Sequence, residues 1–444
     1  MLSLRFTFEE QSMRKQSRLF TLIFIFIITS LTGQGIYAQN DEINNAVVSY
    51  RKHELKNGFV LSFGGEREEL RTDETRLYQE QNIFNGNYML ESSFWNLLDY
   101  KQEKLNFLFD VGPTAGYGNW IDSSKVNFTD ASHTLYGMRA TADVRYWNRF
   151  YYDPKSYSLI DVRAKGRYDL FNQNSEGTVI DSFGVSTPLD EREWKDSWQF
   201  GIEAKAAVGF GRLSPMNHLM TAHYLLEKYY PGRVFSDYEI ARFAQEIADL
   251  KHARNVRSGH STEKEMETLA DFVRGQMMLE SPESMEAEWS FGEFDPRYEG
   301  RRIEMGPFFK YYNQEPDFVY GGYVQFDWAT YQSVKWNRNF GLNLNYNRYK
   351  KQDWMTAELK LGWSYYSNLR SQFDFGVKYV PGIEINGFDN VGPLSHNFIP
   401  YMAWYSQLNS SSRIRFDFAW RIADSEQFLL PGPEFSLAFY RSRY

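Results

Sequence analysis

Residues 198–210 read Trp-Gln-Phe-Gly-Ile-Glu-Ala-Lys-Ala-Ala-Val-Gly-Phe, with apolar or aromatic side chains at every second position. The positions between them include Gln199, Glu203 and Lys205. Because successive side chains of a strand point to opposite faces, this stretch predicts a β-strand with one apolar and one polar face. Soluble strands average about 5 to 6 residues, whereas a tilted membrane-spanning strand needs about 9 to 11. The length of the alternation therefore favours a strand that crosses a membrane.

Four further stretches alternate in the same way, at residues 136–146, 357–365, 373–379 and 414–420. Charged residues occupy the positions between the apolar ones. A row of charged side chains on the face opposite an apolar one must point away from lipid. We therefore expect two charged rows to line the lumen of a barrel. These residues are Arg413, Arg415, Asp417, Arg421, Glu358 and Lys360.

The number of such segments predicts the size of the barrel. Candidate strands begin near Phe59, Tyr88, Leu105, Thr134, Ser158, Trp198, Ile303, Phe318, Val334, Trp354, Phe373, Ile399, Ser412 and Glu434. Bacterial single-chain barrels have an even number of strands, so we predict an all-β transmembrane antiparallel barrel of about 14 strands. Weaker segments, such as one around Trp289, would raise the number to about 16 if they also formed strands.

The beginning of the chain predicts export. Arg14, Lys15 and Arg18 precede an apolar run at residues 19–28, and Ala38 offers a cleavage point. This arrangement is typical of a secretory signal peptide, which we place at residues 1–38. No later stretch approaches the roughly 18 apolar residues that a membrane-spanning helix needs.

The other end of the chain is an aromatic strand, residues 435–444, that stops on Tyr444. It resembles the closing strand of bacterial outer-membrane barrels, which the barrel assembly machinery reads. Phe435 and Phe439 share one parity, while Tyr440 and Tyr444 share the other. Either a bulge lies near Phe439 or the second set faces the lumen.

Composition agrees with a barrel in an outer membrane. The chain is 18% aromatic, yet its mean hydropathy is only −0.56. Barrels combine an apolar lipid face and aromatic girdles with a polar lumen, whereas the alternative is an aromatic-rich soluble β-sandwich. Residues 1–38 hold four basic and two acidic residues, so 45 basic and 55 acidic residues remain and the exported chain has a charge of −10. That charge disfavours a nucleic-acid partner.

The middle of the chain changes period from 2 to 3.6 and predicts three short amphipathic helices. We expect the first to begin at Ser214 and Pro215, and the other two to begin with capping boxes, Ser236 with Glu239 and Thr262 with Glu265. The apolar faces of the last two helices are candidates for docking a periplasmic protein or peptidoglycan. These residues are Phe243, Ile247, Leu250, Leu269 and Phe272.

Strand parity predicts where this insertion lies. If the first strand rises from the periplasm, the sixth strand descends, so the helices emerge on the periplasmic side, where turns are normally short. A stabilising cap, a docking platform and a plug in the lumen all remain open for the helices. The predicted organisation is a signal peptide at 1–38, a short periplasmic segment at 39–57, half-barrels at 58–211 and 286–444, and a helical insert at 212–285.

These features together resemble integral outer-membrane barrels of Bacteroidota, a group whose function is largely unassigned. The resemblance rests on the signal peptide, the long aromatic strands, Gly209-x-Gly211-Arg212 at a strand end, the helical block and Tyr444. It implies the fold and an outer-membrane location with lipid as the surroundings, and it brings no catalytic residues.

Motifs for chemistry are scarce. The seven histidines include no His-Glu-x-x-His pair, and His218 and His223 are five apart, which splays them on a helix. We predict no catalytic, metal or cofactor site. Three classes of function remain: a channel or transport barrel for a small solute, glycan or lipid, which we favour; a structural barrel that anchors an envelope complex through its helices; and a barrel enzyme of the lipase or protease type.

Overall fold

The computed structural model describes residues 49–71, 75–124, 127–254, 261–280, 285–289, 291, 294–313, 317–349, 352–385, 392–423 and 432–444. The predicted signal peptide, residues 1–38, lies outside the described residues, as do residues 39–48 of the predicted N-terminal segment. The rest of that segment is not a separate unit, because the first strand begins at Tyr50, nine residues before the predicted start at Phe59.

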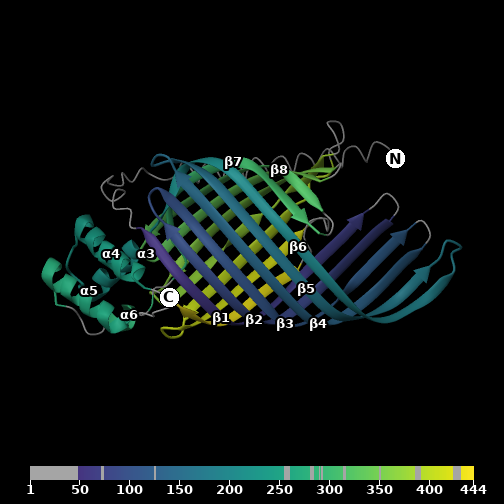
Figure 1. Cartoon of the computed structure of the whole chain (residues 1–444), viewed down its shortest axis with the longest axis horizontal. Helices are drawn as coiled ribbons and strands as arrows, with labels where there is room; N and C mark the ends of the chain where they lie inside the picture. The colour runs from purple at the N-terminus through teal and green to yellow at the C-terminus, as the bar shows by residue number, and fades with distance from the viewer. Residues whose placement is uncertain are drawn as a thin grey trace, which may run out of the picture. The chain divides into compact units, whose positions relative to one another are not determined.

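The strands form one closed antiparallel barrel (Figure 1). Their bounds are β1 Tyr50–Arg71, β2 Thr75–Leu97, β3 Lys101–Ser124, β4 Phe128–Tyr151, β5 Ser156–Ile180, β6 Ser186–Pro215, β7 Tyr298–Tyr312, β8 Phe318–Ser333, β9 Trp336–Tyr349, β10 Gln352–Tyr366, β11 Ser371–Tyr379, β12 Gly382–Ile385, β13 Asn397–Gln407, β14 Ser412–Ala423 and β15 Gly432–Arg443. Both β11 and β12 pair with β10, so they are one interrupted strand. Fourteen strand positions therefore surround the barrel, which confirms the predicted number.

The barrel closes where β1 pairs with β15, from Leu55 opposite Arg443 to Phe63 opposite Phe435. The register of β15 is continuous on both sides, so the strand has no bulge. Instead, the odd-numbered side chains of β15 face outward and the even-numbered ones face inward. Phe439 is 47% exposed on the outside, while Tyr440 and Tyr444 are buried on the inside.

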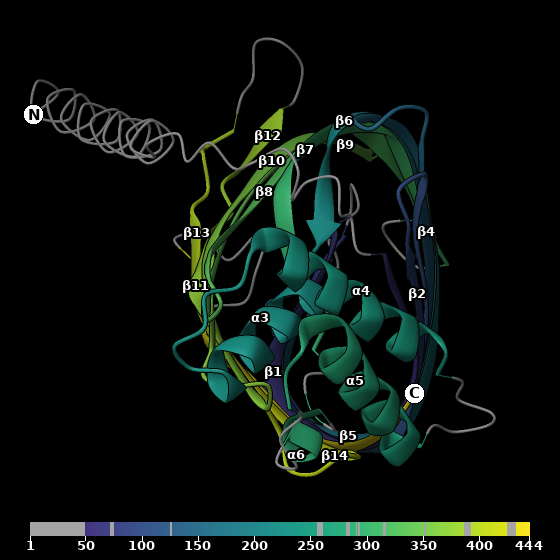
Figure 2. The ribbon, with the colours of Figure 1, turned by 90° about the vertical axis from the view of Figure 1, so that its left-hand side faces the viewer.

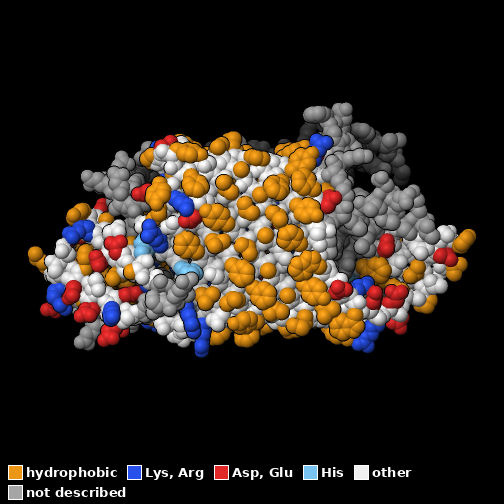
Figure 3. Space-filling model, viewed as in Figure 1, with side chains coloured by type: hydrophobic (Ala, Val, Ile, Leu, Met, Phe, Trp, Pro, Cys, Tyr) orange, Lys and Arg blue, Asp and Glu red, His pale blue; other side chains and the backbone are white. Residues whose placement is uncertain are grey.

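The outer wall is apolar, as the alternation predicted. Trp198, Val208 and Phe210 of β6 are more than half exposed, while Ala207 between them is buried. Large apolar side chains cover the middle of the wall, and the acidic and basic side chains gather towards its two ends (Figure 3). A closed barrel leaves no unpaired strand edges, so the backbone polar groups of the wall are satisfied within the sheet.

The two ends of the barrel differ. At the end where β1 begins and Tyr444 lies, neighbouring strands are joined by 2 to 4 residues, except for the helical insertion between β6 and β7. Towards the other end, β1 to β6 are 22 to 30 residues long, and their hairpins extend beyond the rest of the wall (Figure 1). Residues 190–196 of β6 are exposed there, and six of the seven are acidic or basic: Asp190, Glu191, Arg192, Glu193, Lys195 and Asp196.

The described residues of the insertion form four helices, α3 Asn217–Tyr229, α4 Asp237–His252, α5 Thr262–Met277 and the short α6 Met285–Trp289. Trp289 therefore lies in a helix, and the weak strand predicted around it is wrong. Figure 2 looks at the barrel from this end and shows α3, α4 and α5 in front of the ring of strands. None of the described helices is both long and apolar enough to cross a membrane.

One of the three predicted helix starts is confirmed. Ser236 and Glu239 form the predicted capping box of α4, with both reciprocal hydrogen bonds present. Ser214 and Pro215 do not start a helix, because they continue β6 and pair with Glu299 and Tyr298 at the start of β7.

The start of α5 is one residue earlier than predicted, because the hydroxyl of Ser261 accepts from the backbone N–H of Lys264. The Glu265 carboxylate instead accepts from Arg254 at 2.8 Å and from the indole of Trp289 at 2.8 Å. The predicted insert at 212–285 thus becomes residues 216–297.

The helices have a hydrophobic core of their own. Its members include Leu225, Leu226, Phe243, Ile247, Leu269, Val273 and Trp289, and the barrel contributes Leu369 from the turn between β10 and β11. The residues predicted to dock a partner belong to this core: Phe243, Ile247 and Leu269 are 0% exposed, and Leu250 and Phe272 pack against them. The prediction is wrong for Phe243, Ile247 and Leu269, because side chains without exposed surface cannot contact another molecule, whereas Leu250 and Phe272 are only partly buried.

Candidate functional site

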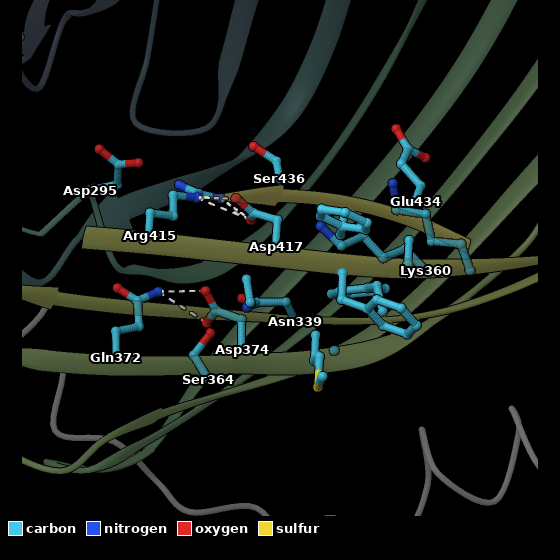
Figure 4. A pocket seen from close by; sticks show the side chains of 18 of the residues that line it. Asp295, Asn339, Lys360, Ser364, Gln372, Asp374, Arg415, Asp417, Glu434 and Ser436 are labelled. Atoms are coloured by element: carbon cyan, nitrogen blue, oxygen red, sulfur yellow. Dashed lines mark hydrogen bonds and ion pairs between the residues drawn. The ribbon is translucent and has the colours of Figure 1, made fainter. Parts of the chain in front are cut away.

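A cavity of about 860 Å³ lies inside the barrel. Its wall is formed by strands β1, β2, β9, β10, β11, β13, β14 and β15, together with residues 295–298, which lead from the helices into β7. Its labelled side chains in Figure 4 are mostly charged, amide or hydroxyl groups. The period of 2 explains this polarity, because the side chains opposite the lipid face all point inward.

The charged row of β14 lies on the inner face. Arg415 and Asp417 line the cavity and form an ion pair at 2.8 Å (Figure 4). Arg421 also lines the cavity and pairs with Glu434 at 2.6 Å. Arg413 shares this face but is completely buried near the helix end, where its guanidinium donates to Tyr444 Oη at 2.7 Å.

The charged row of β10 is divided in the same way. Lys360 lines the cavity, where its side chain is exposed, and it stands directly opposite Lys378 of β11. Glu358 has the same parity as Lys360 but is absent from the residues that line this cavity. Of the six residues predicted to line the lumen, four therefore border the cavity.

The helix end of the cavity is closed by residues 294–297. The Phe294 ring is buried, 5.3 Å from the ring of Tyr366 and 5.6 Å from that of Tyr405, measured between centroids. The Arg297 guanidinium lies 3.7 Å from the centroid of Tyr366, and it donates to Asn337 Oδ1 at 3.2 Å. An aromatic side chain and a buried cation thus fill the lumen at this level.

The first helix holds this segment in place. The Asn217 side chain, at the start of α3, donates to the Asp295 carbonyl at 3.2 Å and accepts from the Arg297 N–H at 2.7 Å. From the barrel side, Tyr50 Oη of β1 donates to the Phe294 carbonyl at 3.4 Å. The position of the closing segment therefore depends on both α3 and the wall.

Asp295 points from this segment into the cavity, to which it is exposed (Figure 4). Desolvation by the surrounding protein would raise the pKa of its carboxyl, but the nearby cations Lys56, Lys52 and Lys104 lower that pKa to about 2. Asp295 is therefore ionised at neutral pH and places a fixed negative charge at the closed end of the lumen.

Two smaller cavities lie near the helix end of the barrel, and only the first shares lining residues with the main cavity. The first, of about 140 Å³, shares Asp295, Gln372 and Arg415 with the main cavity. The second, of about 130 Å³, lies beneath α3 and α4 next to Tyr50, His218 and His252. Phe294 lines both of these smaller cavities. Its side chain therefore separates the lumen from the space under the helices.

Around Glu304, between β4, β5, β7 and β8, side chains fill the lumen. Glu304 of β7 is buried and accepts from Arg149 Nη2 at 3.0 Å, from Tyr157 Oη at 2.9 Å and from Tyr323 Oη at 3.5 Å. Tyr157 and Tyr323 also belong to a buried apolar cluster with Phe308. A buried carboxylate with this many hydrogen-bond partners stabilises the wall, and the side chains around it leave no room for a solute there.

Sequence reasoning missed residues 294–297 because they lie between a helix and a strand and have no periodicity of their own. It also missed Lys378, although the alternation at 373–379 contains it. Within the described residues no group of three or more His, Asp and Glu side chains could hold a metal ion.

Comparisons with known proteins were made by family model, by sequence and by structure. No protein-family model matches the chain. No curated protein matches it either.

Among solved structures, the translocator domain of the autotransporter NalP from Neisseria meningitidis is 8% identical, with 91% of this chain and 92% of that chain covered and a TM-score of 0.31. The β domain of the Bordetella autotransporter Brka is 8% identical, with 89% and 100% covered and a TM-score of 0.30. A low-pH structure of Pseudomonas putida OprB is 9% identical, with 90% and 94% covered and a TM-score of 0.28. At these TM-scores the likeness supports no functional assignment.

Proposed function

We propose that the chain is an outer-membrane barrel that conducts a small polar solute through its lumen, and that residues 294–297 close the passage in this conformation. The observation that carries the proposal is the cavity of about 860 Å³ lined by charged and amide side chains. A barrel that served only as an anchor could fill its whole lumen with paired side chains, as this one does around Glu304.

The outer surface supports the membrane location. Aromatic side chains gather on the outside near the helix end: Trp336 and Tyr365 have ring centroids 4.7 Å apart, and Trp363 and Phe375 are 5.7 Å apart. Aromatic girdles of this kind mark the level of the lipid headgroups in outer-membrane barrels.

The short connections at the helix end are typical of the periplasmic side of such barrels, so we place the helices in the periplasm. A protease site inserted at Gly232, where nothing lies within 4 Å of an added Cβ, tests this orientation. The site should resist protease added to intact cells. Cleavage from outside would place the helices on the cell surface.

The proposed mechanism follows from the position of Phe294. Since its side chain separates the lumen from the space beneath the helices, a displacement of residues 294–297 would join the cavities. Asn217 bonds both sides of this segment, so a movement of α3 relative to the wall would move the closure with it.

Solute uptake into proteoliposomes tests the conduit. Phe294→Ala should raise the rate of osmotic swelling with a small sugar several-fold over wild type, because it removes the ring that packs on Tyr366 and Tyr405. Phe183→Ala is the matched control, since Phe183 is 90% exposed in the β5–β6 turn. Equal swelling by all three proteins, at equal insertion, would contradict the proposal.

A second candidate is the anchor, and one observation favours it. Val234 and Met278 are 94% and 90% exposed, and both lie at the end of the helical block where Arg233 donates to the Met277 carbonyl at 3.2 Å. If this surface holds an envelope partner, Val234→Ser with Met278→Ser should abolish co-purification of that partner and leave swelling unchanged. The third class, a barrel hydrolase, has no observation in its favour among the described residues.

A further inference from the structure

Two lysines in the cavity stand side by side, and neither forms an ion pair with an acid that the structure describes. Lys360 and Lys378 are directly opposite in the register of β10 and β11 and face the cavity together. Like charges at such positions destabilise a sheet. Within the described part of the chain, neither ammonium group has a carboxylate within 4 Å, whereas Arg415 and Arg421 in the same cavity are both paired.

A tyrosine completes the arrangement. Tyr401 of β13 stands opposite Gly376, and its ring extends along the wall, so that a Cβ added at Gly362 or Gly376 would collide with Tyr401 Oη. The two ammonium groups approach this one ring, with Lys360 Nζ 5.6 Å and Lys378 Nζ 5.9 Å from its centroid. The two glycines therefore leave space for the ring that brings the lysines together.

Neutral donors lie at the same level of the wall. Asn339 of β9 stands opposite Gly362 and lines the cavity (Figure 4). Within the described residues, no protein group accepts from the hydroxyl of Tyr401 or from the Asn339 amide. Two cations, a phenol and an amide thus present donors to the same part of the cavity.

The nearest acids that the structure describes form no ion pair with either lysine. Asp374 lies four residues before Lys378 and is engaged by the Gln372 amide, whose nitrogen donates to its two carboxylate oxygens at 3.0 and 2.8 Å. Asp327 is paired with Arg302 at 2.8 Å. Glu358, two residues before Lys360, does not line the cavity.

We infer that Lys360, Lys378, Tyr401 and Asn339 form a binding site for an oxyanion, the phosphate or carboxylate group of a small solute. An anion between the two ammonium groups would relieve their repulsion and accept hydrogen bonds from the phenol and the amide. The cavity is larger than a single phosphate ion needs, which leaves room for the rest of the solute. The role of this site depends on the proposed function, because an oxyanion site in the lumen would determine which class of solute the barrel conducts.

Calorimetric titration of the detergent-solubilised full chain with inorganic phosphate, and separately with succinate, tests the site. Wild type should bind at least one of the two probes, and the probe that binds identifies the group. Lys360→Gln with Lys378→Gln should weaken binding at least tenfold, Tyr401→Phe a few-fold, and the double Lys→Arg variant should retain it. Lys155→Gln with Lys335→Gln removes the same charge from exposed turns and should bind like wild type. Heat-modifiable migration establishes that each variant is folded.

The outcomes separate this inference from the proposed function. If wild type binds neither probe, or if the double Lys→Gln variant binds like wild type, the oxyanion site is overturned whether or not the barrel conducts. If binding depends on the two lysines but neither wild type nor Phe294→Ala conducts any solute, the site stands and the conduit fails.

Discussion

Arg413 and Arg415 lie two residues apart on the inner face of β14, yet their surroundings give them different roles. Arg413 has no exposed surface and its guanidinium lies against the ring of Tyr444, so it fixes the last residue of the chain to the wall. Arg415 borders the cavity and is paired with Asp417 on the same strand. Only the second arginine can act on a solute.

The charge of Arg415 should therefore influence ion selectivity. Arg415→Glu replaces one half of an ion pair with a like charge beside Asp417 and makes the cavity more negative. We expect the reversal potential in a salt gradient to shift towards cation selectivity, measured in planar bilayers on the Phe294→Ala background. Arg274→Glu on the exposed face of α5 is the control and should cause no shift. An unchanged potential in Arg415→Glu would show that this arginine does not line the conducting path.

Leu361 tests the other face of the wall. It lies between Lys360 and Gly362, both of which face the lumen, so its own side chain points outward. Leu361→Lys should lower the free energy of unfolding from lipid vesicles by about 2 to 4 kcal/mol if the residue is near the bilayer midplane. Ser436→Lys places the same group in the cavity and should cost much less. Equal losses in both variants would contradict the assignment of the two faces.

At the scale of elements, the helical block combines a self-contained core with a few defined contacts to the barrel. Its core residues come from all four helices. The contacts to the wall include an apolar one through Leu369 and polar ones, such as His252 of α4 with Arg51 of β1 and Glu288 of α6 with Arg370. The strands on either side of the insertion already pair up to Pro215 opposite Tyr298.

Deletion of the block should consequently spare the barrel. Replacing residues 216–297 with a short Gly-Ser turn connects two strand ends that are already neighbours. We expect the shortened protein to reach the outer membrane and to show heat-modifiable migration like wild type. Failure to insert would mean that the helices are needed to assemble the wall.

The contact between α4 and β1 should depend on pH. His252 Nε2 accepts from the Arg51 N–H at 2.9 Å, in the part of β1 that extends past the end of its pairing with β15. Burial and the neighbouring Arg51 lower the pKa of His252 to about 4. When α4 is released from β1, the pKa of His252 returns to the ordinary value of about 6.5. Between these two pKa values the released state therefore binds a proton that the state in contact does not, so the contact weakens as pH falls through that range.

Hydrogen exchange measures this dependence. Protection factors in α4, corrected for the intrinsic exchange rate, should fall between pH 7.5 and pH 5 in wild type. His252→Gln keeps an acceptor for Arg51 but does not titrate, so its protection should stay constant over the same range. A parallel fall in both proteins would assign the effect to a group other than His252.

At the scale of the whole molecule, the features that sequence predicted are those set by local periodicity. The alternation at residues 198–210 predicts which side chains of β6 face out, and the repetition of that pattern predicts 14 strands. The capping box at Ser236 and Glu239 depends on residues three apart, so it too was predictable.

The features that sequence did not predict depend on distant neighbours. Helical periodicity identified Phe243 and Leu269 as apolar, but it could not show that other helices cover them. Ser214 and Pro215 have the residue types of a helix start, yet pairing with β7 keeps them in a strand. Phe294 acquires its position only because the chain returns from the helices through the end of the lumen.

A barrel with a polar lumen that residues 294–297 close should conduct freely only when this segment is displaced or absent. Single-channel conductance in planar bilayers tests it most directly, with wild type compared with the variant in which a Gly-Ser turn replaces residues 216–297. Wild type should show little or rare conductance and the variant a steady, larger one, because the ring of Phe294 and the guanidinium of Arg297 no longer fill the lumen. A folded, inserted variant that conducts no more than wild type would contradict it.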